Sequence, residues 1–374
     1  MANVLIAGGG FAGVVAAELL AKKLGREHEI SLVSRHRKFV YYPALVRFAF
    51  DECTADEIEF NVRETLTDHR IRFLEGEVAR VYPSKKHITF AHGDVEGDIP
   101  YDYLILALGR RLKTEAVPGF NEHANHLLTL NAAEKFGRAV KQFNKGTAII
   151  GYCDGARLAV PVFETAFALA RKLAARGTRS DCQIKIVANE SLNEMFGGAP
   201  ISESLTETLK SHDIELINDF SITKVTSNEI FASDGRRLEY DLNMVLPPYS
   251  GPGALIRTGL VDQDGYIVVD AQMRASKGDS IYAIGDCVSL PGPKMGHMAV
   301  RQATVAVENL IKQIQGEKCT AAYEHELMLV IDTGGESTFV HYDLSGGEAP
   351  TISQSRFWGW AKRKQQQFWQ AQHS

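Results

Sequence analysis

The chain opens on a short apolar run that meets a glycine-rich turn and then a run of good helix formers. The residues are VLIAGGGFAGVVAAELL, and Gly8, Gly10 and Gly13 have the Gly-x-Gly-x-x-Gly spacing. We predict a buried parallel strand over 3–7 and a helix over 13–24. A strand, this turn and a helix in that order are typical of a dinucleotide-binding unit. Its glycines allow the tight turn, the approach to a pyrophosphate and the close packing of the helix, while the helix N-terminus attracts the anion.

The next strand, predicted over 28–34, ends without the acid that binds an adenosine ribose in many such units. Ser34 and Arg35 stand there instead. Arg35 suits a 2′-phosphate, which would indicate NADP. Two distant segments favour a flavin.

Both segments read as strands that end in polar or glycine residues. GDSIYAIGDCVSLPG (278–292) predicts a strand that runs into Gly285 and Asp286. A carboxylate at the carboxyl end of a strand lies where open α/β sheets bind ligands, and it can accept hydrogen bonds from a ribityl chain. YDYLILALGRRL (101–112) predicts an apolar strand whose end, at Ala107 and Gly109, suits a close approach to the cofactor.

In this order the three segments resemble the two-dinucleotide-binding-domain flavoproteins, which include glutathione-reductase-like enzymes, type II NADH dehydrogenases and sulfide:quinone oxidoreductases. The resemblance runs over nearly the whole chain. It implies an α/β fold with two Rossmann-like domains of the glutathione reductase type and a non-covalent FAD. Residues 1–112 and 243–320 would form the FAD domain, and 113–242 an inserted second dinucleotide-type domain. Residues 321–374 would form a β-hairpin and an amphipathic helix.

The second domain begins with a broken version of the glycine turn. Its residues run Gly151, Tyr152, Cys153, Asp154, Gly155, without the middle glycine. An unpaired carboxylate at Asp154 would repel a pyrophosphate. The following strand ends in Glu190, which could meet a ribose. NAD(P)H is therefore an alternative donor that this turn disfavours.

Loss of that turn resembles the branch of sulfide:quinone oxidoreductases and flavocytochrome c sulfide dehydrogenases. LPPYSGPG (246–253) and PGPKMGHMAVRQATVAVENL (291–310) resemble the same branch. The second of these implies that Lys294 and the helix after it place positive charge beside the flavin, which stabilises its reduced anion. A solvated loop lysine is the alternative interpretation.

The cysteines on which sulfide oxidation depends in that branch are missing from the matching positions. Leu128, Leu158 and Leu329 stand there. Cys153 could supply a redox thiol, with a small packing residue as the alternative interpretation. Cys287 is expected to pack beneath the flavin pyrophosphate.

The predicted catalytic residues are Cys153 and Lys294. The predicted cofactor-binding residues are Gly8, Gly10, Phe11, Ala12, Gly13, Ser34, Arg35, Tyr42, Pro43, Val78, Ala107, Gly109, Gly285, Asp286, Lys294, Met295 and Gly296. Tyr42 and Pro43 are expected to wall one side of the flavin.

The last twenty residues, SRFWGWAKRKQQQFWQAQHS, hold all three tryptophans of the chain and a basic cluster. On a helix, Phe357, Ala361 and Phe368 share a face, with Trp358 and Trp369 beside it. Aromatic and basic residues in this mixture suit a membrane surface. A helix that covers the core or a dimer interface is the alternative.

Composition excludes some classes of function. The net charge is −5 and no long basic block occurs, so we expect no nucleic-acid partner. The five cysteines form no CxxC pair, and we expect no metal site. The strand predicted at the N-terminus leaves no room for a secretory signal, and no run of about 18 apolar residues spans a bilayer.

These observations favour a cytoplasmic protein bound peripherally to the inner face of the membrane. We expect a sulfide:quinone-oxidoreductase-like enzyme that passes two electrons from an unidentified small donor through FAD to a quinone. The alternatives are a type II NADH:quinone oxidoreductase-like enzyme and a flavin-binding partner protein that has lost catalysis. The sequence leaves self-association open.

Overall fold

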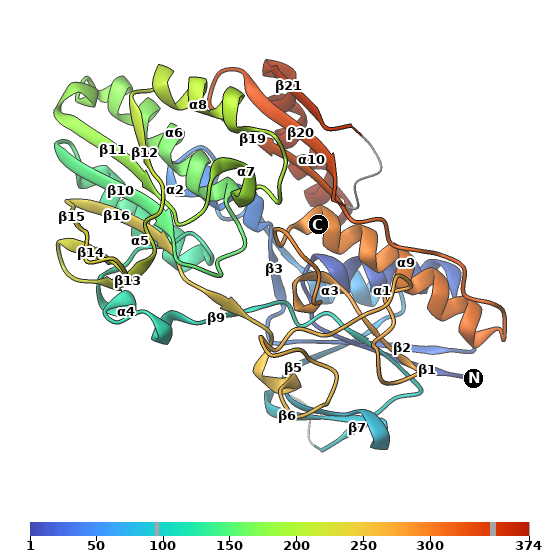
Figure 1. Cartoon of the computed structure of the whole chain (residues 1–374). Helices are drawn as coiled ribbons and strands as arrows, with labels where there is room; N and C mark the ends of the chain where they lie inside the picture. Colours follow the sequence, from blue (N-terminus) through green and yellow to red (C-terminus); the bar gives the residue numbers. More distant parts are fainter. Residues whose placement is uncertain (94–96, 345–348, 374) are drawn as a thin grey trace.

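A mixed sheet built around the N-terminal strand forms the first half of the molecule (Figure 1). The structure, a computed structural model, describes residues 1–93, 97–344 and 349–373. The strand order is β18 (Ile281–Ala283), β8 (Tyr103–Leu106), β1 (Asn3–Ala7), β2 (Glu29–Ser34), β5 (Arg72–Tyr82), β6 (His87–Gly93) and β7 (Ile99–Pro100). The first five strands are parallel and the last two antiparallel. The predicted strands over 3–7 and 28–34 are confirmed within a residue at each end, and the strand predicted before Gly285 is β18.

Two long helices, α1 (Phe11–Lys23) and α9 (Gly296–Ile314), lie side by side on one face of this sheet (Figure 1). The strands β1 and β8 are almost completely buried and apolar, as expected for parallel strands covered on both faces. The segment between β2 and β5 holds four short elements: β3 (Lys38–Val40), α2 (Leu45–Ala49), β4 (Glu59–Asn61) and α3 (Val62–Asp68).

The second half of the molecule is built on a smaller parallel sheet. Its order is β12 (Ile214–Ile217), β11 (Cys182–Val187), β10 (Gly146–Tyr152) and β16 (Leu242–Leu246). The helices of this half are α4 (Phe120–His123), α5 (Leu130–Gln142), α6 (Val160–Arg176), α7 (Leu192–Met195) and α8 (Ser202–Ser211). An antiparallel sheet of β13 (Ile222–Val225), β14 (Glu229–Ala232) and β15 (Arg237–Glu239) is attached.

The chain crosses between the halves at a two-stranded ribbon, β9 (Arg111–Leu112) with β17 (Tyr249–Ser250). β16 pairs with β10 in the second sheet. The chain therefore returns to the first half after Leu246, a few residues later than the predicted boundary at 242.

The C-terminal segment is larger than the predicted hairpin. β19 (Glu326–Ile331) and β20 (Ser337–Asp343) pair as expected, and a third strand, β21 (Thr351–Ser355), adds to β20. Helix α10 (Arg356–His373) follows and connects both halves. Lys362 donates to Glu164 of α6, and His373 forms an ion pair with Glu18 of α1 at 3.0 Å.

Candidate active site

The N-terminal glycine turn has the geometry of a dinucleotide-binding turn. Gly8 has φ +118°, and a Cβ there would lie 2.0 Å from the carbonyl oxygen of Ala107. A Cβ on Gly13 would lie 1.8 Å from the carbonyl oxygen of Gly8. Among the described residues nothing lies within 4 Å of a Cβ built on Gly10. Packing thus requires two of the glycines, while the third faces open space.

The N-terminus of α1 is available to an anion. Gly10 is its N-cap in extended conformation, and no side chain caps the first turn. The first N–H groups of a helix have no partner within the helix, so a phosphate placed over this turn would satisfy them.

Three neighbouring parallel strands end at the same edge of the sheet. β8 lies between β1 and β18, so Gly109 and Asp286 follow strands next to the glycine turn. The backbone N–H of Ala107 donates to the carbonyl oxygen of Ala7 at 2.7 Å. The backbone N–H of Gly285, whose φ is +76°, donates to the side-chain oxygen of Gln302 at 2.6 Å. The topology therefore brings together the three predicted segments.

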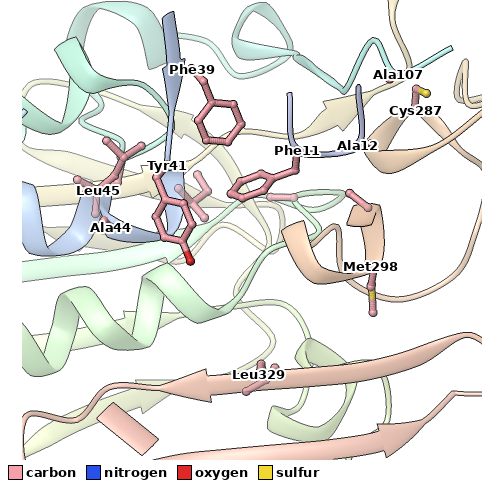
Figure 2. Packing of buried hydrophobic residues seen from close by; sticks show 14 of the residues in the cluster. Phe11, Ala12, Phe39, Tyr41, Ala44, Leu45, Ala107, Cys287, Met298 and Leu329 are labelled. Atoms are coloured by element: carbon pink, nitrogen blue, oxygen red, sulfur yellow. The ribbon is translucent and has the colours of Figure 1, made fainter. Parts of the chain in front are cut away.

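Cys287 packs at this edge, beside Ala107 (Figure 2). Its Sγ donates to the carbonyl oxygens of Leu106 and Ile284 at 3.3 and 3.2 Å. Burial raises the pKa of the thiol to about 11. Cys287 is therefore a packing residue here, and no thiolate is favoured.

Asp286 forms an ion pair with Arg110, and the two side chains are only 12% and 11% exposed. The guanidinium lies 4.5 Å from the ring centre of Tyr249 and 5.9 Å from that of Tyr42. Arg110 and Tyr249 were not among the predicted site residues. An arginine directly after Gly109 was the signal that could have pointed to it.

Lys294 is 4% exposed, so it is not a solvated loop lysine. Its Nζ donates to the carbonyl oxygen of Val288 and lies 4.5 Å from the ring centre of Tyr266. Burial, with a smaller contribution from Arg157, lowers the pKa of the ammonium to about 8. Together with Asp286 and Met295 it lines a small cavity.

Helix α9 starts directly after Lys294 and approaches the glycine turn. Met295 is its N-cap, without a side-chain cap. A Cβ on Gly296 would lie 3.4 Å from the Phe11 ring and 3.5 Å from the hydroxyl of Tyr42. The start of α9 at Gly296 therefore meets Phe11 and Tyr42.

Other predicted cofactor residues lie around this edge with less specific roles. A Cβ on Gly9 would lie 2.6 Å from Ser34 Oγ, so Ser34 adjoins the turn. Arg35 is exposed and pairs with Glu77 at 3.7 Å. Pro43 lies with Tyr42 in a short 3₁₀ helix, and Val78 is half-buried at a register shift between β5 and β6.

Ala12 and Phe11 anchor the turn in the core. Phe11 lies 4.8 Å from Phe39, 5.5 Å from Tyr41 and 4.8 Å from Trp369, measured between ring centres. Figure 2 shows the Phe11 ring facing Phe39 and Tyr41. The glycine turn is therefore held by an aromatic cluster that includes the C-terminal helix.

The corresponding turn of the second half is closed by its own side chains. The Tyr152 hydroxyl donates to Glu190 at 3.1 Å. Asp154 accepts hydrogen bonds from Ser221 and, at 3.4 Å, from Asn189. A cleft opens there, with Glu190 and Glu194 among its lining residues. Carboxylates in this position disfavour a pyrophosphate.

Cys153 lies in the hydrophobic core of the second half. It is 1% exposed and packs in a cluster with Ile149, Val187 and Phe220. Burial raises the pKa of its thiol to about 12, with a further contribution from Asp154. The placement favours the packing interpretation over the redox one, because a buried neutral thiol is a poor nucleophile.

Leu128, Leu158 and Leu329 provide no nucleophile at the positions where cysteines were expected. Leu158 and Leu329 are buried, and Leu128 is partly buried. These three positions therefore carry no thiol that could take part in sulfur chemistry.

Helix α10 divides its aromatic residues between two faces, which the sequence analysis did not predict. Trp369 is buried, and Trp358 stacks on Phe339 at 4.1 Å. Phe357, Trp360 and Phe368 are 54%, 50% and 60% exposed. Trp358 and Trp369 therefore do not share the outer face with Phe357 and Phe368, because Trp369 enters the core and Trp358 stacks on β20.

Residues 1–93, 97–344 and 349–373 contain neither a membrane-spanning helix nor a metal site. No helix there combines the length and the apolar character needed to cross a bilayer. The same ranges hold no group of three or more histidine, cysteine or acidic residues that could bind a metal ion.

A glycine turn after β1 and a carboxylate after β18, in a molecule with two sheets of parallel strands, define a protein with two dinucleotide-binding folds. Comparison with family models matches residues 2–308 to the pyridine nucleotide-disulphide oxidoreductases. The chain belongs to that family.

Individual relatives agree with this assignment. The chain is 24% identical over 354 residues to the mitochondrial sulfide:quinone oxidoreductase of Mus musculus, covering 89% of this chain and 76% of that protein. It is 25% identical over 339 residues to the type II NADH:quinone oxidoreductase of Haemophilus influenzae, covering 78% and 74%.

Among solved structures, the sulfide:quinone oxidoreductase of Aquifex aeolicus has the same fold. The TM-score is 0.92 at 20% identity, over 98% of this chain and 90% of that one. The type II NADH dehydrogenase (NDH2) of Plasmodium falciparum matches with a TM-score of 0.75 at 15% identity, over 99% and 96%. The predicted fold class and resemblance are thus confirmed.

Proposed function

We propose that this chain is an FAD-dependent oxidoreductase that passes two electrons from a small donor to a quinone at a membrane surface. One observation carries the proposal: the Gly8–Gly13 turn and the Asp286 carboxylate lie at the ends of strands in one sheet, with β8 between them. The names of both relatives given above specify a quinone.

The residues at this edge fit an FAD. The N–H groups of the first turn of α1 would hold the diphosphate. Asp286 would accept hydrogen bonds from ribityl hydroxyls, since its ion pair with Arg110 engages Oδ2 and a carboxylate has two oxygens. Bound there, FAD supplies a carrier for two electrons.

Lys294 and the N-terminus of α9 would place positive charge near the isoalloxazine. The start of α9 adjoins Tyr42 and Phe11 of the glycine turn, and Lys294 lies two residues before it. A cation and a helix N-terminus favour negative charge nearby, so they would stabilise a reduced anionic ring and raise its reduction potential.

The site does not favour a protein-bound persulfide as the electron donor. NADH remains only the alternative donor. A persulfide needs a reactive thiolate, whereas Cys153 and Cys287 are buried and their thiol pKa values are raised. The Tyr152–Glu190 hydrogen bond and Asp154 stand where the second dinucleotide would lie. The open cleft beside them is the observation that keeps NADH as the alternative donor.

Helix α10 supports a peripheral position on the membrane. Phe357, Trp360 and Phe368 are exposed, and Arg356, Arg363 and Lys364 are exposed on the same helix. An exposed aromatic face with basic neighbours suits a bilayer surface, where a quinone is dissolved.

Anaerobic stopped-flow mixing tests the proposal. Sulfide, NADH and NADPH are offered separately to the purified protein, and a short-chain quinone is then added. We expect the quinone to reoxidise the reduced flavin rapidly, and we expect Cys153→Ala to behave as wild type. A reduced flavin that the quinone leaves unchanged would contradict the proposed acceptor. Rapid reduction by NADH would move the assignment to the alternative donor.

A further inference from the structure

Arg110 stands in the candidate active site with part of its hydrogen-bonding capacity unused. It follows β8 by four residues, at the edge where the glycine turn and Asp286 lie. One of its terminal N–H groups bonds Asp286. Among the described residues, its buried Nε–H has no hydrogen-bond partner. A buried donor without a partner costs about 1–3 kcal/mol, so a ligand that accepts this hydrogen bond would gain from it.

Two tyrosines fix the direction of the guanidinium. Tyr249, on the ribbon between the halves, lies 4.5 Å away, and Tyr42, beside the start of α9, lies 5.9 Å away. Aromatic faces on a guanidinium restrict its rotamers and stabilise its charge. Arg110 is therefore held between the carboxylate proposed for the ribityl chain and the residues proposed for the isoalloxazine.

Two further cations lie near Arg110. Arg157 and Lys294 lie 6.0 and 4.5 Å from the ring centre of Tyr266, and both interact electrostatically with Asp286. Arg110 therefore shares the Asp286 carboxylate with two other cations, while Asp262 and Asp264 act on Arg157. A cation that shares its counterion favours a ligand that is an anion or becomes one.

We infer that Arg110 contacts the flavin portion of the bound cofactor and stabilises its reduced form, in addition to Lys294. This inference rests on the proposed FAD site. A cation held in place by packing stabilises charge that develops on a ligand without reorganisation. Arg110 is then a determinant of the reduction potential of the cofactor.

Potentiometric titration of the visible spectrum of FAD-loaded protein tests the role. The variants are Arg110→Gln, Arg110→Lys and, as matched control, Arg111→Gln. Arg111 is the neighbouring arginine, 50% exposed, in an ion pair with Glu115 at 2.7 Å. A fluorescence titration gives the FAD dissociation constant of each variant, and thermal melting shows whether it folds.

We expect Arg110→Gln to move the midpoint potential to more negative values. A tenfold loss in the ratio of reduced to oxidised flavin corresponds to about 30 mV for a two-electron couple. Arg110→Lys should recover part of this shift, and Arg111→Gln should show none.

A folded Arg110→Gln protein with unchanged potential would overturn the inference, even if it melts earlier than wild type. Wild type that binds no FAD at all would refute the proposed function instead. The two failures are therefore distinguishable.

Discussion

The ring of Trp369, near the end of the chain, lies edge-on against the ring of Phe11 in the glycine turn, with 4.8 Å between their centres. Phe39 stacks on the same tryptophan at 5.7 Å, and His373 does so at 4.5 Å. The last helix thus supports the turn that opens the chain, although more than 350 residues separate the two in sequence.

Removing this contact should weaken both stability and cofactor binding. We expect Trp369→Ala to lower the free energy of unfolding by about 3–5 kcal/mol, the usual range for a buried tryptophan. The FAD dissociation constant should rise because Phe11 loses its support. Urea unfolding and FAD titration measure the two effects. Trp360→Ala, on the exposed face of the same helix, should change stability by no more than about 0.5 kcal/mol. Equal stability of both variants would contradict the packing described for α10.

A substitution at Gly10 should distinguish an effect on stability from an effect on FAD binding. Because a Cβ there meets open space, Gly10→Ala should lower the free energy of unfolding by no more than about 1 kcal/mol, the effect of a helix N-cap. The added methyl group should obstruct the diphosphate, so FAD should bind much more weakly. Gly335→Ala, also open but in the β19–β20 turn, is the control and should bind FAD as wild type. Unimpaired FAD binding by Gly10→Ala would place the diphosphate elsewhere.

The outer face of α10 should govern vesicle binding without affecting the fold. Full burial of a large apolar side chain contributes about 1.5–3 kcal/mol, so replacing Phe357, Trp360 and Phe368 with serine should reduce cosedimentation with anionic vesicles by more than tenfold. The melting temperature should stay near that of wild type. Met328→Ser, at another exposed apolar residue, is the control. Undiminished cosedimentation of the triple variant would exclude this face as the membrane contact.

Lys294 should make stability depend on pH in the alkaline range. Burial lowers its pKa to about 8 in the folded protein, so between pH 8 and the ordinary lysine value the unfolded chain binds more protons. Stability contributed by this residue therefore rises with pH across that window. Relative to Lys294→Met, wild type should gain about 1–3 kcal/mol between pH 7.5 and 10, at about 1.4 kcal/mol per pKa unit. Urea unfolding of both proteins at the two pH values measures the difference, and a difference that stays constant would contradict the burial of a charged ammonium.

The parts of the site whose conformation depends on a few neighbouring residues were predictable from the sequence. The order of strand, glycine turn and helix locates Gly8, Gly10 and Gly13, and the strand before Asp286 places its carboxylate at a sheet edge. β8, Ala107 and Gly109 follow the same rule. These features depend on backbone geometry that a few neighbouring residues determine.

Features that depend on tertiary packing were not predictable. Arg110 was missed because its role depends on Tyr42 and Tyr249, which approach it from distant segments. The aromatic pattern of α10 did not show which rings point inward, because Trp369 is buried through contacts with Phe11 and Phe39, which are distant in sequence. β21 was missed because Thr351–Ser355 is short and mostly polar, and its pairing with β20 alone makes it a strand. The choice between a redox and a packing role for Cys153 depended on whether the residue after β10 continues into the core.

The most direct test of the account is whether the protein binds FAD at the N-terminal turn. Gently purified protein, and protein freed of cofactor and then titrated with FAD, are examined by visible absorption and calorimetry, with Gly10→Ala in parallel. The account predicts a yellow wild-type protein that binds close to one FAD per chain, and a folded Gly10→Ala variant that binds it poorly. Wild type that stays colourless after FAD is added, or a Gly10→Ala variant that binds FAD equally well, would contradict it.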